Sequence, residues 1–194
     1  MDRRGFIAAT GSGALVALLG SCATTEPVDP KDTRMSLLCG YIDSSDAPSK
    51  IEWVEIKQYG DGDRDQGQQG YYLVEYDRKT GVFFHVGIES GNHQVHKFGG
   101  GNTQYDWSSR GRNETALRIT QPGAYFVGAY KYIHHDQGWF KDDKFEMRLL
   151  SSPSEAEVLA IVLRRLETDR DLAPYEHQRA LVRKRLAALG GRRA

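Results

Sequence analysis

Short apolar runs of period two, each closed by glycine, proline or polar turn residues, follow one another through most of this 194-residue chain. Such alternation is typical of a strand with one buried face, because successive side chains point to opposite sides. Many short strands joined by tight turns favour two packed antiparallel layers. We therefore expect a mainly β chain, with an antiparallel β-sandwich over residues 35–150. The expected strands span 36–43, 51–59, 71–76, 81–88, 93–98, 115–120, 124–133 and 144–150, with a long polar loop over 99–113.

The run 81–88 has the clearest buried face of these strands. We expect Phe84 to point into the core of the sandwich and Phe83 to point to the opposite face. Gly81 closes the short connection from the preceding strand, where a left-handed backbone conformation is usual. The apolar positions of this face are Val82, Phe84, Val86 and Ile88.

Beyond Leu150 the apolar period changes from two to that of a helix. Ser152–Glu155 has the sequence of a capping box, with Pro153 at the first helical position. Pro174 begins a second helix, and Gly190 with Gly191 ends it. We expect a C-terminal helical hairpin over residues 151–191 that packs through apolar faces. Those faces contain Val158, Leu159, Val162, Leu163 and Leu166, then Leu181, Val182, Leu186 and Leu189.

The N-terminus ends a short apolar run in Leu19-Gly20-Ser21-Cys22. A charged start, an apolar middle and small residues before a cysteine are the anatomy of a signal peptide, here residues 1–21. The segment resembles the lipobox of bacterial lipoproteins, which implies a diacylglycerol on Cys22 and an acyl-chain anchor. Residues 22–34 carry prolines and charges without an apolar period, so we expect a flexible tether. By the same resemblance, Ala23 favours the outer membrane.

Arg3-Arg4-Gly5-Phe6-Ile7 is similar to the twin-arginine export motif, in which two arginines precede an apolar pair. Its key residues here would be Arg3, Arg4 and Phe6. The resemblance implies that the domain folds in the cytoplasm and crosses the membrane already folded. A general secretory signal that contains two arginines is the alternative interpretation.

Charge and cysteine content exclude two classes of protein. Lysine plus arginine and aspartate plus glutamate are equal in number, 26 of each, so a nucleic-acid partner is not expected. There are two cysteines. If Cys22 carries lipid, Cys39 has no partner within the chain, and a disulfide framework is excluded. Cys39 stands in an apolar run, where we expect a buried, unreactive thiol.

Several of the expected strands share features with a known family. Gly40-Tyr41-Ile42-Asp43, Gly81-Val82-Phe83-Phe84 and Gly91-Asn92-His93-Gln94-Val95 occur in that order. This pattern over about residues 36–133 resembles the carboxypeptidase-regulatory-like, transthyretin-like β-sandwich modules, with His93 at a position where those modules carry tyrosine. The resemblance implies an Ig-like or transthyretin-like sandwich and a non-catalytic role in binding, spacing or assembly.

An acidic loop and five histidines are the candidate metal ligands. Asp61, Asp63 and Asp65 alternate with other residues, as oxygen ligands of Ca²⁺ do, although a solvated hairpin loop has the same composition. A strand places His93 and His96 on opposite faces unless a bulge intervenes. A loop containing His134 and His135 could join either of them. The remaining histidine candidate is His85.

The sequence contains no Gly-x-Ser-x-Gly elbow and no phosphate-binding glycine loop with its lysine. Trp107 or Trp139 could form a sugar-binding face, but packing in the core and at its rim explains the aromatic residues better. We expect a lipid-anchored, non-catalytic binding or assembly module in the periplasm, at the outer membrane. Its partner would be an envelope protein or a glycan. The alternative is a metal- or Ca²⁺-dependent binding protein or an enzyme that folds before twin-arginine export.

Overall fold

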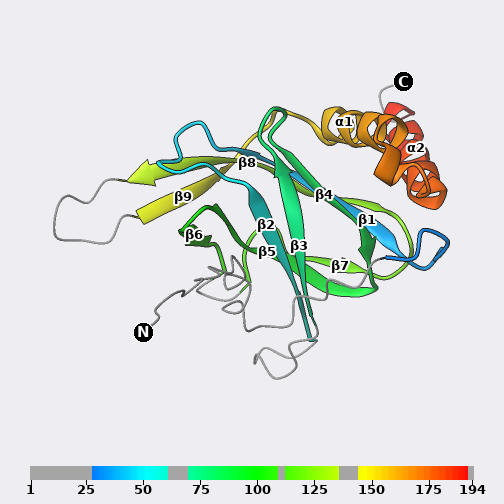
Figure 1. Cartoon of the computed structure of the whole chain (residues 1–194), viewed down its shortest axis with the longest axis horizontal. Helices are drawn as coiled ribbons and strands as arrows, with labels where there is room; N and C mark the ends of the chain where they lie inside the picture. The colour runs from blue at the N-terminus through cyan, green and yellow to red at the C-terminus, as the bar shows by residue number, and fades with distance from the viewer. Residues whose placement is uncertain (1–27, 61–69, 109–111, 136–143, 192–194) are drawn as a thin grey trace, which may run out of the picture.

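A computed structural model of the chain describes residues 28–60, 70–108, 112–135 and 144–191. Within these residues, nine strands form one continuous curled sheet and two helices end the chain (Figure 1). The mainly β class with a C-terminal helical pair is therefore confirmed. The strands are β1 (Ser36–Asp43), β2 (Trp53–Tyr59), β3 (Gly70–Asp77), β4 (Val82–Ile88), β5 (Gly91–Gly100), β6 (Thr103–Asp106), β7 (Leu117–Ile119), β8 (Ala124–His135) and β9 (Lys144–Leu149); α1 (Glu155–Thr168), a 3-10 turn η1 (Arg170–Leu172) and α2 (Glu176–Gly190) follow.

The strands are ordered β6-β5-β2-β3-β4-β1-β8-β9, and β7 pairs with the start of β5. All pairs are antiparallel except β1 and β8, which run parallel. This pair departs from the expected antiparallel arrangement. A parallel pair needs a long crossover, and here strands β2 to β7 supply it.

The sheet curls so that its two halves face each other, which gives the layered core of a sandwich. The halves join through β3 and β4, which pair at Tyr76↔Phe83 and Asp77↔Val82. The fully buried side chains of this core come from both halves. They include Leu38, Ile42, Val54, Ile56, Phe83, Ile88, Val95, Phe98 and Tyr132.

A second apolar cluster lies on the outer face of β1, β4 and β8, beneath the two helices. Phe83 is 1% exposed and packs in the core between the sheet halves. Phe84 is half-buried and packs in the cluster under the helices. The expectation that Phe84 points into the core of the sandwich is therefore wrong. Both faces of β4 are covered, so alternation alone cannot tell which face meets which layer.

The first helix begins two residues later than its expected capping box. Ser154 is the N-cap: its hydroxyl accepts from the Glu157 amide, and its own amide donates to the Glu157 carboxylate at 2.7 Å. Pro153 therefore precedes the cap instead of opening the helix. Ser-x-x-Glu occurs twice in overlapping register here, and the second copy is the one that caps.

One segment that we expected to be a loop forms a strand, and the described end of the expected tether contacts the domain. Thr103–Asp106, inside the expected loop, forms β6 and pairs with the end of β5. In the expected tether, Val28 lies against Gly87 of β4, and its carbonyl accepts a hydrogen bond from Tyr175. In the described part of the chain, no helix is long and apolar enough to cross a membrane.

Candidate functional site

A groove lies where β2 ends, β5 begins and β7 pairs with β5. The register Gly91↔Ile119 and Asn92↔Arg118 places β7 beside the start of β5. Two adjoining hollows of about 390 Å³ each open there, and both are lined by Tyr59, Asn92 and Arg118. We name this feature the Tyr59 groove. Its other lining residues are Gly60, Ser90, Gly91, Arg112, Ala116, Leu117, Ile119 and Thr120.

The Tyr59 groove combines an aromatic face with cationic side chains. The guanidinium carbon of Arg112 lies 4.8 Å from the centroid of the Tyr59 ring, within the range of a cation–π contact. Guanidinium groups bind carboxylates and phosphates through paired hydrogen bonds. Beneath the rim, Gln58 donates to the Ser90 carbonyl at 3.2 Å and holds the β4–β5 turn. The groove can therefore offer stacking and charge-assisted hydrogen bonds to one ligand.

Sequence reasoning missed the Tyr59 groove. Arg112 and Arg118 lie in different segments, and only the β5–β7 register brings them close to Tyr59. Asp61, Asp63 and Asp65, the expected Ca²⁺ ligands, lie outside the described residues. No local signal marked the groove, apart from the aspartates that directly follow Gly60 in the sequence.

A second polar cluster joins Glu55, His96 and Ser108 on the outer side of β2 and β5. The register of these strands shifts after Glu55, which pairs with Lys97 while Ile56 pairs with Val95. His96 is thus the extra residue of a β-bulge, a device that re-aims a side chain. Its Nδ1 makes a short hydrogen bond with the Ser108 hydroxyl, and its Nε2 lies 3.8 Å from Glu55 Oε1.

The surroundings of this cluster fix its members in place. The Ser108 amide donates to Asp106 Oδ1 at 3.1 Å, and the His96 ring lies 5.6 Å from the Tyr71 ring. The pKa of the Glu55 carboxyl is raised, mainly by burial. Nearby Lys97 opposes this shift, and Asp106 adds to it. A hydroxyl, an imidazole and a carboxylate in series can move a proton away from the hydroxyl.

The other histidines do not join this cluster. His85 and His93 both contact Tyr72, with ring centroids 5.2 Å and 5.9 Å from the tyrosine ring. Burial lowers the pKa of His85 to about 4 and also lowers that of His93. His134 contacts Tyr132 at the far end of β8, and His135 lies 3.4 Å from Glu146.

The bulge that joint chelation by His93 and His96 requires is present in β5, but His93 bonds to the Glu89 carbonyl and His96 to the Ser108 hydroxyl. Within residues 28–60, 70–108, 112–135 and 144–191, no group of three histidine, cysteine or acidic side chains could hold a metal ion.

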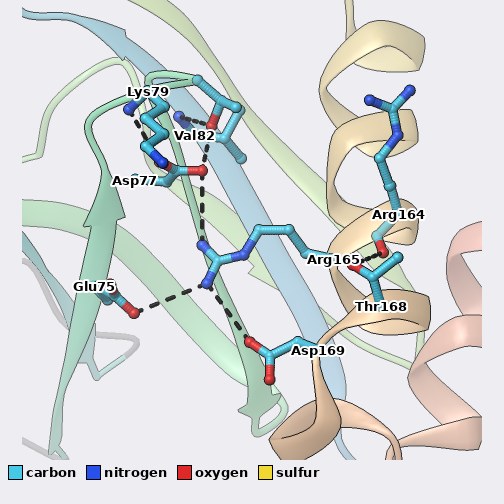
Figure 2. Close-up of polar contacts among 9 residues, drawn as sticks. Glu75, Asp77, Lys79, Val82, Arg164, Arg165, Thr168 and Asp169 are labelled. Atoms are coloured by element: carbon cyan, nitrogen blue, oxygen red, sulfur yellow. Dashed lines mark hydrogen bonds and ion pairs between the residues drawn. The ribbon is translucent and has the colours of Figure 1, made fainter.

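Arg165 of α1 joins the helical layer to the β3–β4 hairpin. Figure 2 shows its guanidinium between Glu75, Asp77 and Asp169, at 3.9, 4.0 and 4.0 Å. Its carbon also lies 5.4 Å from the centroid of the Phe84 ring. The Asp77 carboxylate also caps the turn to β4 by accepting from the Lys79 amide and the Thr80 hydroxyl. This cluster serves to dock the helices.

Of the other residues that the sequence singled out as candidate functional residues, some lie in the described part of the chain and some do not. Cys39 is fully buried, as expected, and burial raises the pKa of its thiol. Trp107 packs edge-on against Tyr130 and donates its indole N–H to Glu114 at 3.1 Å, which favours core packing over a sugar-binding face. Cys22, Arg3, Arg4, Phe6 and Trp139 lie outside the described residues.

Comparisons with known proteins add a partial structural similarity. No protein-family model matches the chain, and no curated protein matches it. Among solved structures, it is similar to the major pilin subunit of Bacillus cereus, with a TM-score of 0.27 and 13% sequence identity. The similarity covers 48% of this chain and 29% of the pilin chain, so the chain spans less than a third of that protein.

Proposed function

We propose that this chain is a lipid-anchored protein of the bacterial cell envelope that binds an anionic glycan in the Tyr59 groove. Cys22 would carry the lipid and hold the protein at the outer membrane, facing the periplasm. The binding role is non-catalytic, as the resemblance to carboxypeptidase-regulatory-like modules implies.

The single observation that carries the binding role is the convergence of Tyr59, Arg112 and Arg118 at one groove. A tyrosine ring stacks on the apolar face of a sugar, and a guanidinium pairs with a carboxylate or phosphate on the same polymer. The amide of Asn92 can donate to and accept from hydroxyl groups. These are the groups that recognition of an acidic envelope glycan needs.

Binding to a purified acidic cell-wall polymer, measured by calorimetry, tests this proposal. Arg112→Gln combined with Arg118→Gln should weaken binding at least about tenfold, because each charge-assisted hydrogen bond contributes about 1.5–3 kcal/mol. Arg148→Gln on β9 is the matched control, since Arg148 is exposed and does not line the groove. Equal affinity of all three proteins for the polymer would refute the site, and capture of an envelope protein alone would reassign the ligand.

The anchor and the export route need separate tests. Radiolabelled palmitate should appear on the wild-type protein and be absent from Cys22→Ala. An unlabelled wild-type protein would refute the proposed lipid anchor.

Replacing Arg3 and Arg4 by lysine should block export if the twin-arginine route is used. Normal export of that variant would place the protein on the general secretory route.

The Glu55–His96–Ser108 cluster favours a second candidate function, acyl transfer by an enzyme that folds before export. The Ser108 oxygen would attack an ester carbonyl and pass its proton to His96 Nδ1, while Glu55 stabilises the imidazolium. The leaving alcohol would take that proton, and water would then release the acid from the acyl-serine. A fluorophosphonate probe should label the wild type but not Ser108→Ala, with exposed Ser45→Ala as the control. Absence of labelling of the wild type would exclude this function.

A further inference from the structure

Residues 28–34, which precede β1, form a strap fixed to the domain. The Val28 side chain lies directly on Gly87, and a Cβ at that glycine would overlap its methyl groups. The Tyr175 hydroxyl donates to the Val28 carbonyl at 3.1 Å, which joins the strap to the start of α2. These contacts hold the first described residue between β4 and the helical layer.

The strap is also ordered along its own length. The Asp29 side chain accepts from the Lys31 amide, and the Asp32 amide donates to the Asp29 carbonyl. Asp32 accepts from both the amide and the guanidinium of Arg34. Side chains of this kind that bond to the backbone two residues on make tight local turns. Val28 is therefore held in a fixed position on the domain.

The fixed position of Val28 limits how far the domain can move from a lipid on Cys22. Val28 lies six positions after Cys22, with five residues between them, and a fully extended chain over those six steps spans about 22 Å at most. Strand β8 starts beside Leu37 of β1 and runs for 12 residues to His135, about 40 Å at strand geometry. Figure 1 accordingly places the N-terminal described segment and the β8–β9 hairpin at opposite ends of the molecule. The hairpin end is thus farther from the anchor point than the linker can reach.

We infer that the strap orients the domain, with the end formed by Val28, the β4–β5 turn and the start of α2 against the bilayer that holds the anchor. The β8–β9 hairpin then points away from that bilayer. Ser90, which lines the Tyr59 groove, lies three residues after Gly87, so one edge of the groove belongs to the β4–β5 turn. This inference rests on the proposed lipid on Cys22.

Energy transfer to head-group-labelled lipid in vesicles tests the orientation. A donor dye is placed on a new cysteine at Glu176, whose side chain is 87% exposed beside the strap, or at exposed Lys144 on β9. The native Cys39 is fully buried and stays unlabelled. The lipidated protein should show higher transfer from position 176 than from position 144. Equal transfer from both positions, or higher transfer from position 144, would overturn the orientation.

A strap variant separates the strap from the anchor. Val28→Asp with Tyr175→Phe removes both contacts while leaving the buried core intact, which a thermal melt checks. The difference in transfer between the two positions should then disappear, and amide exchange of residues 29–34 should increase. An unchanged difference would show that the strap does not orient the domain. Absence of palmitate from the wild type would refute both the proposed lipid anchor and the proposed orientation. A palmitate-labelled protein with equal transfer from the two positions would refute the orientation alone.

Discussion

Burial of the His85 imidazole makes the unfolding free energy of the protein sensitive to acid. His85 Nδ1 accepts from the Gly87 amide at 3.0 Å, and burial lowers its pKa from 6.5 to about 4. Between those pH values the unfolded chain binds a proton that the folded protein does not. The contribution of neutral His85 is therefore complete above pH 6.5 and is lost as the pH falls toward 4, by up to about 3 kcal/mol.

The unfolding free energy measured against pH tests this linkage. His85→Gln keeps an acceptor for the Gly87 amide but does not titrate, so the loss of stability between pH 6.5 and 4 should be smaller than in the wild type. His135→Gln is the control, because its side chain is 47% exposed at the end of β8. The buried His93, whose pKa is also lowered, should account for part of the remaining slope. An identical slope in His85→Gln would contradict the assignment.

The two phenylalanines of β4 give a direct test of which layer is the main core. Phe83 is 1% exposed between the sheet halves, and Phe83→Ala should cost about 3–5 kcal/mol of unfolding free energy. Phe84 is half-buried between α1 and the sheet, so Phe84→Ala should cost less. Denaturant unfolding of both variants measures the two losses. A larger loss at Phe84 would mean that the helical interface contributes more to stability than the sheet interior.

At the scale of elements, the position of the helix cap can be decided with two serines. Ser154→Ala removes the hydroxyl that caps α1 and should cost about 1 kcal/mol. Ser152 lies two residues earlier and is exposed, so Ser152→Ala should leave the unfolding free energy nearly unchanged. Chemical denaturation compares the two variants. A larger loss of unfolding free energy in Ser152→Ala than in Ser154→Ala would show that Ser152 is the N-cap, as the sequence pattern first indicated.

Elements with a strong period could be predicted from the sequence, and those set by long-range pairing could not. The period-two run of β1 predicts that strand, and the helical period of α1 predicts the helix and its buried face, because each depends on nearby residues. β6 is only four residues long and exists through its pairing with β5. Both polar sites also depend on long-range strand pairing, so the sequence alone did not indicate them. His96 is aimed by a bulge that appears only when β5 is paired with β2, and Arg118 reaches Tyr59 only through the β5–β7 register.

At the scale of the whole molecule, the helices are a third layer and not an appendage. They cover an outer sheet face in which Leu37 and Cys39 are 0% exposed and Val82 is 1% exposed. Arg165 ties α1 to Glu75 and Asp77 of the β3–β4 hairpin. Arg185 of α2 reaches back to Glu155 of α1 with hydrogen bonds of 2.6 and 3.0 Å. The sheet, with an apolar patch on its outer face, therefore depends on the helical pair for solubility.

Removal of the helical pair tests this dependence, with Cys39 as the reporter. In a chain that begins at Ala23, Cys39 is the remaining cysteine, and burial beneath α1 raises the pKa of its thiol. The full-length form should not react with a thiol reagent under native conditions and should react completely in denaturant. A form that ends at Leu150 should react rapidly without denaturant and aggregate, because the apolar face then meets water. A soluble, folded truncated form with an unreactive Cys39 would show that the curled sheet buries this face by itself and that the helices are dispensable.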